Sequence, residues 1–258
     1  MVQQFEDEVT KTTIELDSLQ KILSSLHAKY AEERFLLMEK SVVKRINRAA
    51  FAGMWIDKPL EGKRKKIIKK ENPDTLILLG DVKSSIQNIT KTEWNDVPYF
   101  FEEIKNSLDI ILIPGNHDSN IDRLIPNDVT LIGSKGMIID DILLTHGHTM
   151  PSKNYSNVNN IIMGHIHPVY FDQNSLLNGE RIWISIKTEK SKIFPSTKGN
   201  LNITIIPSFN PYFYATEKRY YKKSISPIVE KIKDSTMAKI LTLDGTIIGN
   251  ESIIDQVL

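Results

Sequence analysis

Short aliphatic runs alternate with polar and charged stretches along most of the chain, and this pattern predicts a mixed α/β protein. Runs of this length, bounded by Gly, Pro, Asn or Asp, are typical of buried strands. We predict strands at Leu76–Leu79, Ile110–Ile113, Val129–Ile132, Met137–Ile139, Ile142–Leu144, Ile161–Met163, Arg181–Ile186 and Asn202–Ile206.

Helical spacing of apolar residues appears between two of these strands. From Thr92 to Leu108 the spacing predicts an amphipathic helix. Because the helix would connect the strand ending at Asp81 to the strand leading to His117, we expect a right-handed βαβ crossover with parallel strands. A further helix is predicted over Lys29–Phe51, which is rich in helix formers and lacks Gly and Pro.

The end of the chain has a hairpin pattern. Ile240–Leu243 and Thr246–Ile248 flank Asp244-Gly245, which predicts two strands joined by a two-residue turn. No repeat or linker interrupts the chain. We therefore expect a single domain over residues 1–258, with a motif-bearing core at about 20–170 and a β-rich part at 171–258.

Composition narrows the class of protein. With 258 residues, 40% hydrophobic and 25% charged, the chain can bury a full α/β core, which excludes disordered and fibrous classes. A net charge of +1 gives no overall attraction to nucleic acid or membranes, and the absence of cysteine excludes thiolate metal sites. No apolar run approaches the ~20 residues of a membrane span. The acidic start lacks a signal-peptide core, so we expect a cytoplasmic protein.

Two segments have a composition that can bind nucleic acid. Lys63–Lys70 contains six basic residues, although a solvated helix face is the interpretation we favour. Residues 212–223 mix Tyr and Phe with Lys and Arg, as base-stacking sites do, although a packed surface loop is favoured there.

Five of the six histidines directly follow predicted strands. They are His117, His146, His148, His165 and His167. Asn-His-Asp after Pro-Gly is also ordinary turn chemistry, but the same placement at three strand ends favours a shared site. In α/β sheets, ligands bind where the loops leaving the strands converge.

The polar residues at these strand ends suit a metal site. The candidate ligands are Asp81, Asn116, His146, His165 and His167. Their oxygen and nitrogen atoms suit manganese, iron or zinc. Two cations about 4 Å apart would clamp an in-line phosphoryl displacement and lower the pKa of a bound water enough to supply hydroxide. His117 would then act as an acid toward the leaving oxygen, and Asp118 would orient its ring.

Four ordered motifs resemble the signature of the calcineurin-like metallophosphoesterases. These motifs are Gly80-Asp81, Gly115–Asp118, His146–His148 and Gly164–His167. A closer resemblance, to the archaeal SbcD-related phosphoesterases, extends to Pro168 and to Ile206–Pro211. It covers roughly residues 20–250. The resemblance implies a four-layer αββα sandwich with two metals at one end.

The resemblance also implies a role for each residue. Asp81 would bridge the metals, His167 would bind the first, and His117 would be the catalytic histidine. The implied ligands of the second metal are Asn116, His146 and His165. Ser24–His27 aligns with the family's first motif, so His27 is an implied ligand of the first metal, but Ser25 stands where a carboxylate is expected. We therefore predict a weakened first site.

The resulting hypothesis is a metal-dependent phosphoesterase that hydrolyses phosphodiesters, with nucleic acid among the candidate substrates and manganese as the expected metal. The alternative is an impaired phosphate- or partner-binding module on the same fold. A purely structural protein is the third reading. The sequence leaves the oligomeric state open.

Overall fold

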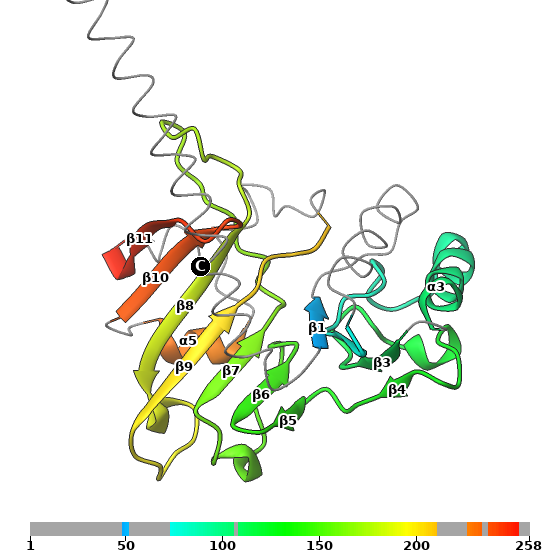
Figure 1. Cartoon of the computed structure of the whole chain (residues 1–258), viewed down its shortest axis with the longest axis horizontal. Coiled ribbons are helices and arrows are strands. Elements are labelled where there is room, and N and C mark those ends of the chain that lie inside the picture. The colour runs from blue at the N-terminus through cyan, green and yellow to red at the C-terminus, as the bar shows by residue number, and fades with distance from the viewer. Residues whose placement is uncertain (1–47, 52–72, 106–107, 211–225, 234–236, 253–258) are drawn as a thin grey trace, which may run out of the picture.

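The described strands form two sheets (Figure 1). The computed structural model describes residues 48–51, 73–105, 108–210, 226–233 and 237–252. Within them, the smaller sheet is parallel, with the order β1 (Arg48–Phe51), β2 (Thr75–Leu78), β3 (Asp109–Leu112) and β4 (Thr130–Leu131).

The larger sheet is mixed. Its order is β11 (Ile247–Asn250), β10 (Met237–Thr242), β8 (Ile182–Glu189), β9 (Asn200–Ile205), β7 (Asn160–Met163), β6 (Ile142–Thr145) and β5 (Met137–Ile139). The strands β6, β7 and β9 run parallel, so β6 and β7 end at the same edge. Four of the five strand-end histidines follow these two strands: His146, His148, His165 and His167.

Among the described residues, two α-helices flank the sheets. The predicted helix is α3 (Lys91–Ile104), which connects the parallel strands β2 and β3 as the crossover prediction required. The second is α5 (Pro227–Ile232), which begins with Ser226 as its N-cap and Pro227 in its first turn. Short 3-10 helices lie at Ile121–Arg123, Lys153–Tyr155 and Lys190–Lys192. None of the described helices has the length and apolar character needed to cross a membrane.

Alternating side chains of the strands build three separate cores, which confirms the four-layer αββα fold. Leu76 and Leu78 of β2 pack with α3, whereas Ile77 points to the opposite face, into a cluster shared by both sheets. In the larger sheet, Ile184 packs with α5, and its neighbour Trp183 points toward the smaller sheet. Successive side chains of a strand point to opposite faces, so β2 is buried on both faces, whereas β9 and β10 each leave alternate side chains exposed.

Two secondary-structure predictions were wrong in part. Arg48–Phe51 is not helical but forms β1, because parallel pairing with β2 outweighs a modest helix propensity. The predicted hairpin exists, but Thr242 N donates to Thr246 O, so the loop is Leu243–Gly245 rather than a two-residue turn. Gly245, with φ +87°, supplies the left-handed residue that this longer loop needs.

Several predictions fall outside the described residues. They concern residues 29–47 of the predicted helix, the basic run Lys63–Lys70, the aromatic and basic segment 212–223, and the first motif with Ser25 and His27. The single-domain boundaries also stay a prediction.

Candidate metal centre

The turn after β2 places Asp81 at the centre of the cluster. Gly80 and Asp81 both have left-handed backbone, with φ of +75° and +55°, and the side chain of Asp81 is buried. A β-carbon on Gly80 would overlap His146 Nδ1 and would lie 2.5 Å from Gly115 N. Glycine is therefore required at this position, because the strand ends carrying Asp81, Gly115 and His146 pack directly against one another.

The loop after β3 carries Asn116, His117 and Asp118. Gly115, in the same loop, also contacts Asp81 closely: an added β-carbon would meet Asp81 Oδ1 and would lie 2.6 Å from Asp81 N. The backbone N–H of His117 donates to Asp81 Oδ1 at 3.3 Å. These contacts hold the carboxylate in one orientation.

The remaining candidates come from the larger sheet. His146 follows β6, and His165 and His167 follow β7. His165 and His167 have left-handed backbone, with φ of +67° and +51°, which costs of order 1–3 kcal/mol for each non-glycine residue. Such strain persists only where the surrounding structure imposes it, and it is common at functional sites.

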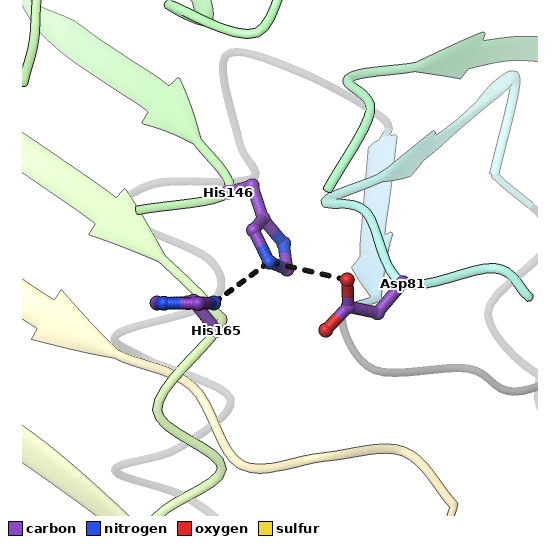
Figure 2. Close-up of side chains that lie close together, drawn as sticks. All are labelled: Asp81, His146 and His165. Carbon is purple, nitrogen blue, oxygen red and sulfur yellow. Dashed lines mark hydrogen bonds and ion pairs between the residues drawn. The ribbon is translucent and has the colours of Figure 1, made fainter. Parts of the chain in front are cut away.

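Figure 2 shows the ring of His146 between the carboxylate of Asp81 and the ring of His165. His146 Nε2 lies 3.3 Å from Oδ1, and His167 Nε2 lies 3.3 Å from Oδ2. His146 Nε2 is also 3.1 Å from His165 Nδ1 and 3.2 Å from Asn116 Oδ1. The structure thus brings together the five predicted ligands for which it describes a position.

The hydrogen bonds of His146 test whether a cation fits here. His146 Nδ1 lies 2.6 Å from the Leu79 carbonyl oxygen, which only accepts, so Nδ1 carries the proton. A neutral ring then presents a lone pair at Nε2 to the oxygens of Asp81 and Asn116. These acceptor atoms repel one another unless a cation lies among them. A backbone carbonyl that orients the ring in this way is typical of histidine metal ligands.

Ionisation also favours metal binding. Burial would raise the pKa of Asp81, but its hydrogen bond with His167 and the nearby histidine rings hold that pKa well below its ordinary value. Burial lowers the pKa of His146 to about 4 despite the nearby Asp81 charge. Burial and the neighbouring His146 lower that of His165 to about 3. A carboxylate and neutral imidazoles are the forms that bind a cation.

His165 gives a second indication. Its Nε2 is buried without a hydrogen-bond partner among the described residues. Asp81, His146 and His165 each offer a ligand atom, and these atoms lie within 4.8 Å of one another. The donor set fits a divalent cation that accepts both nitrogen and oxygen ligands.

His117 is oriented by a group that the sequence did not indicate for this role. Its Nδ1 lies 2.6 Å from the carbonyl oxygen of Ser84, which must accept. The carboxylate of Asp118, expected to orient this ring, instead accepts from backbone N–H groups: Oδ1 from Val82 and Lys83, and Oδ2 from Gly115. Asp118 therefore joins the loop after β2 to the loop after β3.

One histidine that received no role in the sequence analysis lies beside the cluster. The ring of His148 is centred 5.1 Å from that of His146 and 6.0 Å from that of His165. Its Nδ1 is buried and has no hydrogen-bond partner in the described part of the chain. In the sequence, His148 was visible as a strand-end histidine and as part of the His146–His148 motif, but neither observation assigned it a role.

A buried cluster of one carboxylate, one amide and three imidazoles at facing strand ends defines a metal-binding α/β protein. Residues 54–195, more than half of the chain, match the family model described as calcineurin-like phosphoesterase, and the chain belongs to this family. It is a metal-dependent hydrolase acting on phosphoric ester bonds. The broader resemblance is thereby confirmed, whereas the narrower likeness to SbcD-related proteins stays a prediction.

Comparison with solved structures returns matches of low sequence identity, among them these three. A nuclease of Pseudomonas putida is 15% identical over 67% of this chain and 78% of its own, with a TM-score of 0.46. An archaeal phosphodiesterase is 18% identical over 67% and 94%, with a TM-score of 0.39. The phosphoesterase YfcE of E. coli is 16% identical over 79% and 97%, with a TM-score of 0.38. No curated protein matched the chain.

Proposed function

We propose that the chain hydrolyses phosphodiesters at the cluster around Asp81, with His117 as the catalytic residue. The proposed metal ligands are Asp81, Asn116, His146, His165 and His167, together with His27. The clustering of the five described side chains carries this proposal: His146 and His167 lie at the oxygens of Asp81, and Asn116 and His165 lie at His146 Nε2. Membership of the phosphoesterase family supports the reaction class. The preference for diesters rests on the sequence resemblance.

The two oxygens of Asp81 support a bridging role. Oδ1 is near His146, and Oδ2 is near His167, so each oxygen belongs to a different group of ligands. We assign Asn116, His146 and His165 to one cation, and His167 with His27 to the other. Divalent cations, manganese in our proposal, would neutralise phosphoryl oxygens here and make hydroxide available near neutral pH.

His117 is suited to act on the leaving group. Its Nδ1 proton is directed to the Ser84 carbonyl oxygen, so Nε2 is the ring nitrogen that would meet the substrate. A protonated ring would donate from Nε2 to the departing oxygen or stabilise its negative charge.

This role has a direct test. We would measure hydrolysis of a chromogenic phosphodiester with added manganese, for the natural protein and for His117→Ala. We expect turnover that falls by about 100-fold or more in the variant. Equal metal content and equal melting temperature of the two proteins are the controls, because His117 is not a proposed ligand. Undiminished turnover in His117→Ala would remove it from the mechanism.

The first metal is proposed to bind weakly because Ser25 replaces a carboxylate. Calorimetric titration with manganese should show one tight and one weak equivalent, and Ser25→Asp should tighten the weak one and raise turnover. If the weak manganese equivalent binds no more tightly in Ser25→Asp, the first motif does not lie at residues 25–27.

The competing function is a phosphate- or partner-binding module, and the missing carboxylate at Ser25 is the observation that favours it. It predicts that a phosphodiester binds to folded, metal-loaded protein without turnover. Manganese-dependent turnover excludes this function. A single-stranded oligonucleotide, compared with the chromogenic diester under the same conditions, then tests nucleic acid as the substrate.

A further inference from the structure

Two loops meet beside the proposed active site and are joined along their length. The loop after β2 contributes Val82 and Lys83, whose N–H groups donate to Asp118, and Ser84, whose carbonyl accepts from His117. Ser119 Oγ donates to the Ile86 carbonyl oxygen further along. The position of the His117 ring therefore depends on the conformation of the loop after β2, which forms neither helix nor strand.

Glu93, in the first turn of α3, holds this loop. Its Oε1 accepts from Ser84 N at 2.8 Å, Ser84 Oγ at 3.0 Å and Ser85 N at 2.8 Å. Its Oε2 accepts from Ser85 Oγ at 2.6 Å and Thr90 N at 2.8 Å. The side chain is 5% exposed. Only the bond from Thr90 N belongs to the capping box of the helix, so four of the five donors serve the loop.

The peptide unit between Ser84 and Ser85 connects this carboxylate to His117. The Ser84 C=O and the Ser85 N–H belong to one planar trans peptide, so they point in opposite directions. Glu93 fixes the N–H, and the planar peptide therefore fixes the carbonyl that accepts from His117 Nδ1.

We infer that Glu93 is a positioning residue for His117, acting through the Ser84–Ser85 peptide to fix the ring orientation and to keep the proton on Nδ1. This inference rests on the proposed function of His117. It assigns no contact with substrate to Glu93.

Glu93→Gln tests this, with Thr90→Ala as the matched control. The glutamine amide has two possible orientations. In one, its hydrogens face the N–H of Thr90; in the other, they face the N–H groups of Ser84 and Ser85. Thr90→Ala removes the cap that accepts from Glu93 N, but it leaves the carboxylate on the loop. Both variants weaken the start of α3. Only Glu93→Gln should disturb the Ser84–Ser85 peptide.

We expect Glu93→Gln to lower kcat by about 10-fold with KM and metal content unchanged, and Thr90→Ala to leave kcat unchanged. Equal effects of both variants on kcat, or no effect of Glu93→Gln, would overturn the inference. Should Glu93→Gln fail to fold, Glu93→Asp keeps the charge but shortens the reach, and the same expectations apply.

A readout that does not depend on activity separates this inference from the proposed function. Nitrogen-15 NMR of the full chain loaded with diamagnetic zinc should show His117 with its proton on Nδ1 in the natural protein and in Thr90→Ala. A mixture of ring forms is expected in Glu93→Gln. If the natural protein shows no turnover, the proposed function fails, while an identical His117 spectrum in all three proteins would overturn the positioning role alone.

Discussion

Gly115 is the position where a single methyl group should disturb the metal centre most directly. A β-carbon there would meet Asp81 Oδ1, and would lie 2.6 Å from Asp81 N and 2.8 Å from His146 Cε1. Ordinary contact begins at 3.4 Å, so Gly115→Ala must displace Asp81 N and His146 Cε1 by about 0.6–0.8 Å, and Asp81 Oδ1 by more. The displaced atoms are backbone and a buried ring, and neither can turn aside as a flexible side chain would.

The expected cost follows from this displacement. Inserting a methyl group into a close-packed region costs about 1–3 kcal/mol of unfolding free energy. At about 2 kcal/mol, a domain of this size would lose about 4–8 °C in melting temperature. A functional site tolerates roughly 0.5 Å of misplacement, and an error of about 1 Å costs on the order of 100-fold. We therefore expect manganese-dependent turnover to fall by about 100-fold.

Gly133→Ala is the matched control. Nothing lies within 4 Å of a β-carbon added at Gly133, and its backbone is not left-handed. This variant should retain the turnover, metal affinity and melting temperature of the natural protein. Thermal melts, calorimetric titration with manganese and the chromogenic assay compare the three proteins. If Gly115→Ala keeps the metal affinity and the turnover of the natural protein, the site does not depend on the close packing of Gly115 against Asp81.

Two further predictions concern metal and pH. Manganese at about 100 times its Kd should stabilise the protein by about 2.7 kcal/mol, and His146→Ala should abolish most of this gain in a thermal melt. Burial would raise the pKa of Glu93, but hydrogen bonds from Ser85, Thr90 and Ser84 lower it to about 2. Its stabilising effect should be complete above its ordinary pKa, about 4.5, and be lost between about pH 4.5 and 2. The melting temperature of Glu93→Gln should therefore depend less on pH in this range than that of the natural protein. If both melting temperatures fall equally steeply with pH, an ionised Glu93 does not contribute to stability.

Much of the smaller sheet was predictable from local sequence. The apolar runs at Leu76–Leu79 and Ile110–Ile113, separated by an amphipathic helix, predicted parallel strands and a crossover, and β2, α3 and β3 confirm this. The failure at Arg48–Phe51 has a physical reason. Helix propensities differ by less than about 1 kcal/mol per residue, and the neighbouring β2 strand offers hydrogen bonds that no local scale includes.

The candidate ligands were likewise visible as residue types at strand ends, because a strand delivers whatever follows it to the edge of its sheet. The sequence did not show the contacts that orient them. The Leu79 carbonyl, which orients the ring of His146, lies 67 positions away in the chain. The Ser84 carbonyl, which orients His117, lies 33 positions from it, and Glu93, which holds Ser85, lies 8 positions from that residue. The spacing of hydrophobic residues along the sequence carries no information about such contacts.

The sequence by itself determined the strands other than β1, the α3 helix and the chemistry available at their ends, since these depend on spacing and residue type. Only the tertiary structure decided that both sheets place these ends together, that Asp81 divides its oxygens between His146 and His167, and that Asp118 joins the loops instead of orienting His117. The reason is physical. Directions of lone pairs and protons follow from packing between elements that are distant in the chain, and close packing leaves each of these groups one position to occupy.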